Sequence, residues 1–166
     1  MEFEDKIYFY GSKGDYGFLS NFYKSNFEFF INNKIIKFNC SEQYFMYFKC
    51  ITFDPNNNEI LNMILKETNP VKIKALGRKV YNFDEKIWTS KKYFIMMNAL
   101  YYKFSQNLEL KKKLLDTGNK ILYEASPRDK IWGIGFSAKK AFNINPNKYG
   151  SNLLGIALKE IREKFK

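Results

Sequence analysis

Histidine is absent from the 166 residues of the chain, and the only thiols are those of Cys40 and Cys50. Without imidazole, neither a Ser-His-Asp nor a Cys-His catalytic group can be built. Two thiols also cannot supply the four Cys and His ligands of a structural zinc site. We therefore expect chemistry based on carboxylates, lysines, hydroxyls, amides and backbone groups, with no metal and no cofactor.

Long apolar runs and a secretory leader are also missing. No stretch approaches the roughly 18 uninterrupted apolar residues that a membrane span needs. The N-terminus is acidic and has no basic segment followed by an apolar run. Cys40 and Cys50 are placed on one expected helix, about 15 Å apart at 1.5 Å per residue, which is too far for a disulfide. We expect a soluble, intracellular protein, located in the cytoplasm, with free thiols and no membrane partner.

Positive charge and aromatic side chains are plentiful. Lys and Arg number 28 against 17 Asp and Glu, a net charge of +11, and 45% of the residues are hydrophobic. This composition supplies a core and excludes a disordered chain, and the charge attracts phosphates. At roughly 150 residues per domain, the length predicts a single domain over residues 1–166.

The residue pattern predicts a mainly α fold with a small N-terminal β element, in the α+β class. Ile7–Tyr10 is typical of a strand, and Phe27–Ile31 with Lys34–Phe38 predicts a hairpin around Asn32-Asn33. The expected helices are Asn39 to about Thr52, Asn56–Lys66, a third that Asn69-Pro70 caps, about Asp84 to Phe104, Leu108–Leu115 and Ser151–Phe165. On the fourth helix the expected apolar stripe is Ile87, Phe94, Met97, Tyr101 and Phe104.

Glu42 and Lys49 form the first group with chemical potential. Seven residues separate them, so on a helix they share one face about 10.5 Å apart along the axis. A carboxylate there can act as a base or stabilise a cation, and an amine can hold a phosphate or attack an aldehyde. Alternatively, Asn39 caps the helix, Glu42 is the reciprocal acid of a capping box, and Lys49 is an ordinary solvated lysine.

A second group lies in the segment that follows Pro127. There Asp129, Trp132 and the backbone around Gly133 can face a ligand. In the alternative interpretation Asp129 caps a short helix and Trp132 belongs to the core.

Other candidates are weaker. The glycine-rich loop that ends in Ser20 and Asn21 lacks a Gly-Lys-Ser/Thr motif, so it is either a nucleotide-contacting loop or an ordinary one. Arg78 can clamp a phosphate, whereas Trp88 is typical of a core residue. The run Lys111–Lys113 indicates a solvated helix face or a nucleic-acid contact.

The order of these motifs along the chain resembles the YbiA-like family, also called NADAR. The matching motifs are Phe9-Tyr10, Phe18-Leu19-Ser20-Asn21-Phe22, Ser41-Glu42-x-Tyr44-Phe45 with Lys49, Gly77-Arg78, Trp88, Met96-x-x-Ala99-Leu100-x-x-Lys103-Phe104-x-Gln106, Leu114-Leu115-x-Thr117, Leu122-x-Glu124, Asp129-x-x-Trp132-Gly133-x-Gly135 and Asn152-x-Leu154-Gly155-x-x-Leu158-x-x-Ile161-Arg162.

The resemblance implies a mainly helical fold and metal-independent N-glycosidase activity, the hydrolysis of a bond between a ribose C1 and a nitrogen. Implied substrates are phosphorylated ribosyl intermediates of the riboflavin pathway or, in other members, ADP-ribose attached to guanine in nucleic acid. The resemblance assigns catalytic positions to Glu42, Lys49, Trp88 and Asp129. The implied substrate-binding positions are Ser20, Asn21, Phe22, Arg78, Trp132, Gly133 and Asn152.

These residue types suit glycosidic cleavage, which passes through an oxocarbenium-like state that carboxylates stabilise. Our hypothesis makes Glu42 the base or cation stabiliser and Asp129 its partner carboxylate, while Lys49 attacks ring-opened ribose or grips the sugar. A non-catalytic module that binds ADP-ribose or nucleic acid is the alternative from another functional class. The sequence leaves the oligomeric state open.

Three positions depart from the family pattern. Gln43 stands where many members have His, and Met46 and Phe48 replace polar residues that often precede the lysine. If these side chains touch the base or sugar, the pocket is more apolar and the substrate differs.

Overall fold

Asn32 and Asn33 make the hairpin turn that the sequence predicts. Both have positive φ, 49° and 60°, a conformation that asparagine tolerates better than most residues. The turn joins β2 (Phe27–Ile31) to β3 (Lys34–Phe38) in an antiparallel pair in which Phe27 lies opposite Phe38. Both strands begin and end at the predicted residues.

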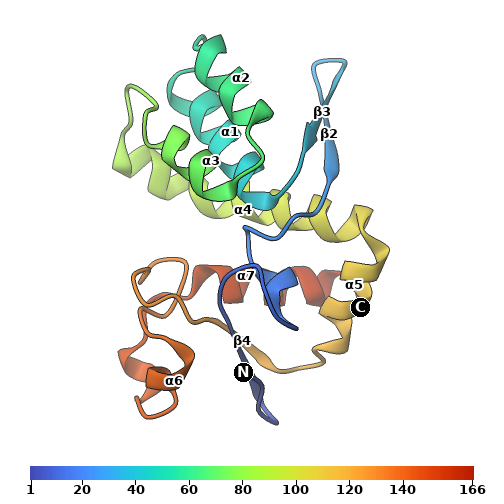
Figure 1. The fold of residues 1–166 in the computed structure, drawn as a ribbon, viewed down its shortest axis with the longest axis vertical. Coiled ribbons are helices and arrows are strands. Elements are labelled where there is room, and N and C mark those ends of the chain that lie inside the picture. Colours follow the sequence, from blue (N-terminus) through green and yellow to red (C-terminus); the bar gives the residue numbers. More distant parts are fainter. The chain divides into compact units, whose positions relative to one another are not determined.

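The computed structural model describes all residues from 1 to 166, and the chain falls into two compact units. Unit 2 is the continuous segment Lys24–Asn107, whereas unit 1 combines Met1–Tyr23 with Leu108–Lys166. Figure 1 labels their helices and most of their strands. Seven helices and four short strands confirm the predicted class, mainly α with a small β element. One domain over residues 1–166 stays a prediction.

Unit 2 is built around α1 (Ser41–Phe53), which packs against the three other helices of the unit. These are α2 (Asn58–Lys66), α3 (Pro70–Gly77) and α4 (Glu85–Gln106). Asn57, Asn69 and Asp84 cap them, each side chain accepting a hydrogen bond from the backbone N–H of the first turn. The predicted helices are thus confirmed, with ends displaced by at most a few residues.

The buried amide of Gln43 ties the start of α1 to the end of α2. Its Nε2 atom lies 2.8 to 3.1 Å from three carbonyl oxygens, those of Ile64, Leu65 and Glu67. Its Oε1 atom accepts a hydrogen bond from the Asn39 backbone N–H at 2.7 Å. One side chain therefore satisfies carbonyls that the C-terminus of α2 leaves without helical partners.

Aromatic rings fasten the hairpin to the helices of unit 2. Phe29 on β2 makes edge-to-face contacts with Tyr44 and Phe48 on α1 and with Tyr102 on α4, at centroid distances of 5.2 to 5.6 Å. Such pairs contribute about 0.5–1.5 kcal/mol each beyond the burial of their area. Part of the high aromatic content is therefore used to attach a two-stranded sheet that has no third strand.

The predicted apolar stripe of α4 is wrong. Phe94 is 69% exposed and Ile87 is 46% exposed, and only Phe104 of the predicted stripe is buried. The buried face is instead formed by Trp88, Lys92, Met96, Ala99, Leu100, Lys103 and Phe104. Apolar residues occur all around this helix, so two stripes fit the periodicity, and the true one includes two lysines that no hydrophobic pattern selects.

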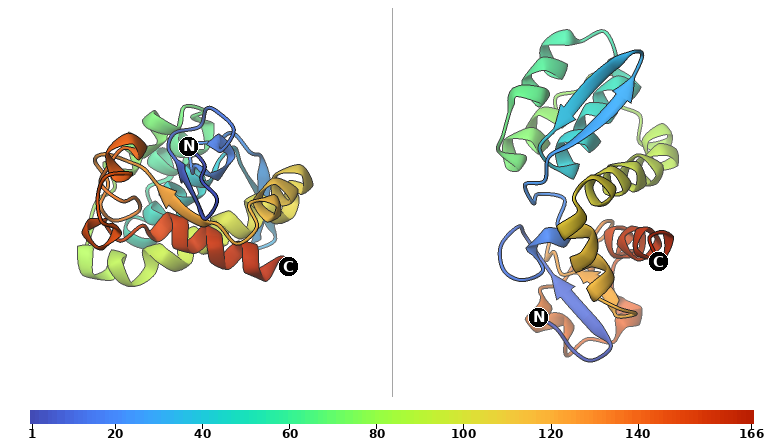
Figure 2. Two further views of the ribbon diagram at one scale, coloured as in Figure 1. Left: turned by 90° about the horizontal axis from the view of Figure 1, so that it is seen from below. Right: turned by 90° about the vertical axis from the view of Figure 1, so that its right-hand side faces the viewer.

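Unit 1 has a core formed by segments from both ends of the chain. Strand β1 (Lys6–Phe9) pairs in parallel with β4 (Ile121–Glu124), and α7 (Leu153–Lys164) packs against β4, as Figure 2 shows. The buried residues of α7 include Leu154, Ala157, Leu158 and Ile161, as predicted. β4 was not predicted, because its only strand partner lies more than 100 residues away in the sequence.

Shorter elements complete unit 1. They are the 3-10 turn Gly17–Leu19, α5 (Leu108–Asp116), α6 (Ala138–Ala141) and the 3-10 turn Pro146–Lys148. Gly118 ends α5 with a φ of 61°, as expected of a C-terminal glycine. None of the helices is both long enough and apolar enough to cross a membrane.

Replacing Gln43 with Ala is expected to lower the free energy of unfolding by about 2–4 kcal/mol, because buried carbonyls and an N–H lose their partner. Urea unfolding followed by circular dichroism measures this change. Asn62 is exposed on α2, so Asn62→Ala is the matched control and should stay within about 0.5 kcal/mol. Equal stability of the two variants would contradict the proposed role of Gln43.

Candidate active site

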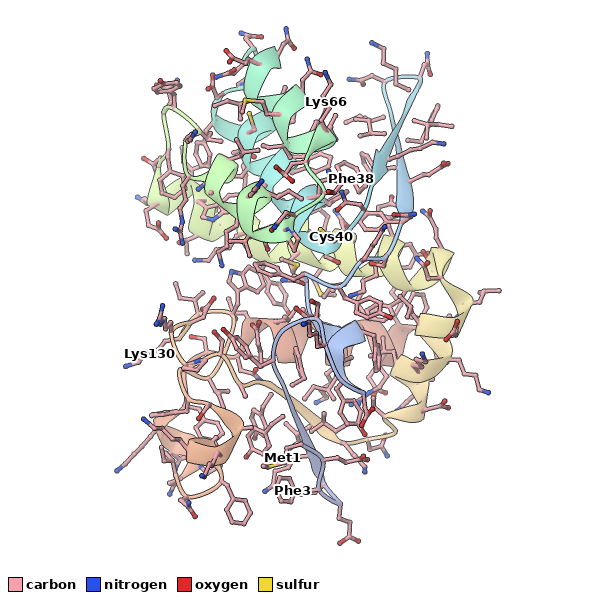
Figure 3. The ribbon with its side chains drawn as sticks, viewed as in Figure 1. Met1, Phe3, Phe38, Cys40, Lys66 and Lys130 are labelled. Carbon is pink, nitrogen blue, oxygen red and sulfur yellow. The ribbon has the colours of Figure 1, made fainter.

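Glu42 lies in the first turn of α1 and is only 4% exposed. The helix is not capped in the predicted way, because the N-cap residue is Cys40, whose side chain makes no capping hydrogen bond. Figure 3 labels Cys40. Gln43, rather than Glu42, accepts the Asn39 backbone N–H. The capping-box interpretation of Glu42 is therefore wrong, and its burial is not explained by a capping role.

Lys49, two turns further along α1, is half-buried among aromatic rings. Its Nζ atom lies 4.3 Å from the ring centroid of Phe83 and 5.9 Å from that of Trp88. Burial lowers the pKa of Lys49, and nearby Arg78 lowers it further, whereas Glu85 and Glu42 raise it. Lys49 is thus not the ordinary solvated lysine of the alternative interpretation.

Trp88 and Arg78 join this group from two other elements. Trp88, on α4, is 7% exposed and packs on Phe45 and Phe53 of α1, at centroid distances of 4.9 and 6.1 Å. It is therefore a core residue that also lies beside Lys49. Arg78 is exposed at the C-cap of α3 and acts on Lys49 electrostatically. Unit 2 thus brings together Glu42, Lys49, Arg78 and Trp88.

The three departures from the family pattern are occupied by packing contacts. Gln43 binds the end of α2, as described above. Phe48 packs on Tyr44 at 4.4 Å between centroids and on the hairpin residue Phe29. Met46 is buried against Gly77, where a Cβ would lie 2.0 Å from its Sδ atom. These contacts account for all three side chains without a ligand.

Asp129 belongs to unit 1 and orders the turn that follows Pro127. Its Oδ1 atom accepts hydrogen bonds from the backbone N–H groups of Ile131 and Trp132, at 2.9 and 2.8 Å. This is an Asx-type turn rather than the cap of a short helix, because no helix begins there. Trp132 is half-buried, so it is not the core residue of the alternative interpretation.

Gly133 and Asn152 join that turn to α7 and β4 within unit 1. The Asn152 backbone N–H donates to the Gly133 carbonyl at 3.3 Å. Its side chain donates to Leu122 O at 2.8 Å and accepts from Glu124 N–H at 3.0 Å. A Cβ on Gly133 would lie 2.8 Å from the Glu124 carbonyl oxygen. Both predicted ligand positions therefore carry structural contacts, and ligand binding by them stays a prediction.

Ser20, Asn21 and Phe22 follow the 3-10 turn Gly17–Leu19, also in unit 1. The Ser20 Oγ atom accepts the Phe22 backbone N–H at 3.1 Å. Ser20 and Asn21 are buried, and Phe22 is half-buried. The loop is therefore ordered at its end by local hydrogen bonds.

Phe83, Glu85 and Lys103 are the notable residues of unit 2 to which sequence reasoning gave no role. Lys103 is fully buried on α4, and desolvation lowers its pKa to about 7. Burial raises the pKa of the Cys40 thiol to about 11, with Glu42 raising it and Lys103 lowering it. The sequence contains Lys103 in the motif around Lys103-Phe104, but no pattern in it indicates that this lysine is buried.

The basic run Lys111–Lys113 is partly engaged inside unit 1. Lys113 pairs with Glu109 at 2.9 Å, and the Lys111 Nζ atom lies 4.6 Å from the Phe165 ring centroid. These contacts favour the interpretation as a solvated helix face.

A cavity of about 550 Å³ lies elsewhere in unit 2. Its lining residues are Asn26, Phe27, Glu28, Lys37, Phe38, Asn39, Gln43, Leu65 and Gln106. None of the predicted site residues lines it, and the amides of Gln43 and Gln106 already bind backbone groups. This cavity is therefore not the place where the predicted site residues lie.

Asp129→Asn should keep the turn, because its carbonyl oxygen still accepts both N–H groups, whereas Asp129→Ala should lose about 1 kcal/mol of stability. Thermal unfolding of the two variants measures the difference. Equal destabilisation of both would show that the hydrogen bonds to Asp129 do not hold the turn.

Lys103 should make the unfolding free energy depend on pH. The unfolded lysine keeps its proton up to about pH 10.4, whereas the buried one releases it above about 7. The unfolded chain therefore binds more protons in this window, and the stability of the wild type should rise with pH relative to Lys103→Met. Chemical denaturation at pH 7, 8 and 9 tests this, and parallel pH curves would contradict it.

The chain was compared with known protein families and with proteins of known name, and it matches one family. The model of the NADAR domain matches residues 8–166. N-glycosidase R617 of Acanthamoeba polyphaga mimivirus is 41% identical over 169 residues, which cover 99% of this chain and 98% of that protein. Protein irg-1 of Caenorhabditis elegans is 44% identical over 159 residues, covering 88% and 74%.

A solved structure and a further sequence relative point to the same family. The NMR structure of the Escherichia coli protein YbiA matches with a TM-score of 0.75 at 29% identity, over 99% of this chain and 86% of that one. N-glycosidase YbiA of E. coli strain K12 is 31% identical over 159 residues, which cover 96% and 88%. The expectation of a hydrolase of the N-glycosidase type agrees with these names. Matched along nearly its whole length by the family model, by these relatives and by that fold, the chain belongs to the NADAR domain family.

Proposed function

We propose that the chain is an N-glycosidase that hydrolyses the bond between a ribose phosphate and a nitrogenous base or amine. The observation that carries the proposal is the buried Glu42 carboxyl group on the same helix as the half-buried Lys49 amine, with Arg78 and Trp88 beside that amine. Relatives named N-glycosidase support the reaction class.

Glu42 is proposed as the base or cation stabiliser. Cleavage of an N-glycosidic bond develops positive charge at the ribose C1 and ring oxygen, and a nearby carboxylate lowers the energy of that state. In a buried position this interaction is stronger than in water, because little solvent screens it. The same carboxylate can accept a proton from the attacking water.

Lys49 has two proposed roles that experiment can separate. Its lowered pKa increases the fraction of free amine near neutral pH, which suits attack on the C1 aldehyde of ring-opened ribose. In its protonated form it instead grips the sugar, while the exposed guanidinium of Arg78 binds the phosphate. Borohydride trapping of a Lys49–sugar adduct, detected by mass spectrometry, would identify the first role.

Asp129 is proposed as the second carboxylate, and Ser20, Asn21, Phe22, Trp132, Gly133 and Asn152 are proposed as ligand-contact positions. For Asp129 the support is its fixed orientation, since two backbone N–H groups bind one of its oxygens. The Asp129→Asn variant tests its chemistry, because it removes the charge while the turn is expected to remain.

ADP-ribose attached to guanine in nucleic acid is the second candidate substrate. The net charge of +11 favours it, since binding to a polyanion gains from counterion release. The contacts that engage Lys111 and Lys113 within unit 1 weaken that argument. A free phosphorylated metabolite therefore remains our leading proposal.

Glu42→Gln should lower kcat by about 10²–10⁴-fold while leaving the fold intact, because it removes the charge and keeps the shape. Glu59 is exposed on α2, so Glu59→Gln is the matched control and should keep wild-type activity. HPLC follows the release of base from a ribosylamino-uracil phosphate and of ADP-ribose from an ADP-ribosylated-guanine oligonucleotide. An active Glu42→Gln variant would contradict the assignment.

The two substrates separate the candidate functions. Release from the metabolite alone supports the leading proposal, and release from the oligonucleotide alone supports action on nucleic acid. Cleavage of neither, with ADP-ribose still bound, would instead identify a binding module.

A further inference from the structure

Phe83 lies in the segment between α3 and α4 and has the ring nearest to the Lys49 amine. It stands between Asn82, which has a positive φ of 54°, and Asp84, which caps α4. Asp84 Oδ1 accepts the Ile87 N–H at 2.8 Å, so the residue after Phe83 is anchored to the helix. The left-handed turn and the cap together restrict where this ring can lie.

The ring of Phe83 contacts two side chains of α1 and is partly exposed to solvent. It makes an edge contact with the buried ring of Phe53 on α1, at 5.2 Å between centroids and 64° between planes. Lys49 Nζ lies 4.3 Å from its centroid, within the range of a cation–π contact. Phe83 is nevertheless 41% exposed, so it lies at the boundary between the amine and solvent.

Such a ring acts on an amine in two opposing ways. Its face attracts the ammonium form, whereas its bulk keeps water away and disfavours that form. The charged groups that act on Lys49 are Glu42 on α1, Arg78 at the end of α3 and Glu85 on α4. Loss of hydration is the largest of all these influences on its pKa, which is lowered overall. Burial of the amine therefore outweighs the charges of Glu42 and Glu85 in setting the pKa of Lys49.

We propose that Phe83 is a positioning residue that covers the Lys49 amine, holds it in place on α1 and shields it from water for its part in the reaction. The inference rests on the proposed function for the reaction in which Lys49 takes part, but the contact itself exists without substrate. It adds a residue of the α3–α4 segment to the group formed by Glu42, Lys49, Arg78 and Trp88.

The test measures the titration of Lys49 in the intact full chain. The rate of Lys49 acylation by acetic anhydride is followed against pH by mass spectrometry, each profile scaled to its own plateau. Phe83→Ala should admit water and move the midpoint upward. A shift of about half a pKa unit would reduce the scaled rate at pH 8 about threefold.

Three further variants separate the ring's effects. Phe83→Leu still excludes water, so its midpoint should not rise, and Phe83→Tyr should resemble the wild type. Phe94 is 69% exposed on α4, so Phe94→Ala is the matched control for loss of an exposed ring. An unshifted midpoint in Phe83→Ala, or an equal rise in Phe94→Ala or Phe83→Leu, would overturn the inference.

Activity assays keep this inference distinct from the proposed function. In an active enzyme, the limb of the kcat–pH profile that depends on Lys49 should move in the same direction as the acylation midpoint. A shifted midpoint in a protein that hydrolyses neither substrate would contradict the proposed function and leave the shielding by Phe83 supported.

Discussion

The hydrogen bonds of the buried Gln43 amide hold the start of α1 against the end of α2, and the position of Glu42 depends on them. Glu42 is the adjacent residue, and Lys49 follows on the same helix, so fixing the first turn of α1 also fixes both proposed catalytic residues. The residue that replaces the family's frequent histidine thus contributes by anchoring the helix. Catalytic groups keep a reactive geometry only when the helices or strands that carry them are held rigidly.

Burial of ionisable groups is the second constraint on unit 2. Glu42, Cys40 and Lys103 are all nearly inaccessible, and the low polarity that raises the pKa of the thiol to about 11 lowers that of the lysine to about 7. Placing such groups inside a protein costs stability, because the charged forms lose hydration. Strongly perturbed groups cluster at functional sites more often than elsewhere, which agrees with the assignment of this region.

Unit 1 contributes backbone segments that side-chain hydrogen bonds hold in order. Asp129 binds two N–H groups of its own turn, and Asn152 uses its amide to join β4 to the start of α7. Close packing adds to this order, since a Cβ at Gly155 would lie 2.0 Å from the Leu122 carbonyl oxygen. Residues that look like ligand positions in a motif can therefore also be required for the fold, and only variants that keep the hydrogen bonds separate the two roles.

Local signals in the sequence by themselves determined the hairpin at Asn32-Asn33, the helices capped by Asn69 and Asp84, and the shared face of Glu42 and Lys49. Each depends on backbone preferences or on spacings of a few residues. Tertiary structure alone decided the β1–β4 pairing, the buried face of α4 with Lys103, the capping contact of Gln43 and the position of Phe83 over the Lys49 amine. These join residues far apart in the chain or depend on which side chains lose water, and neither leaves a periodic pattern in the sequence.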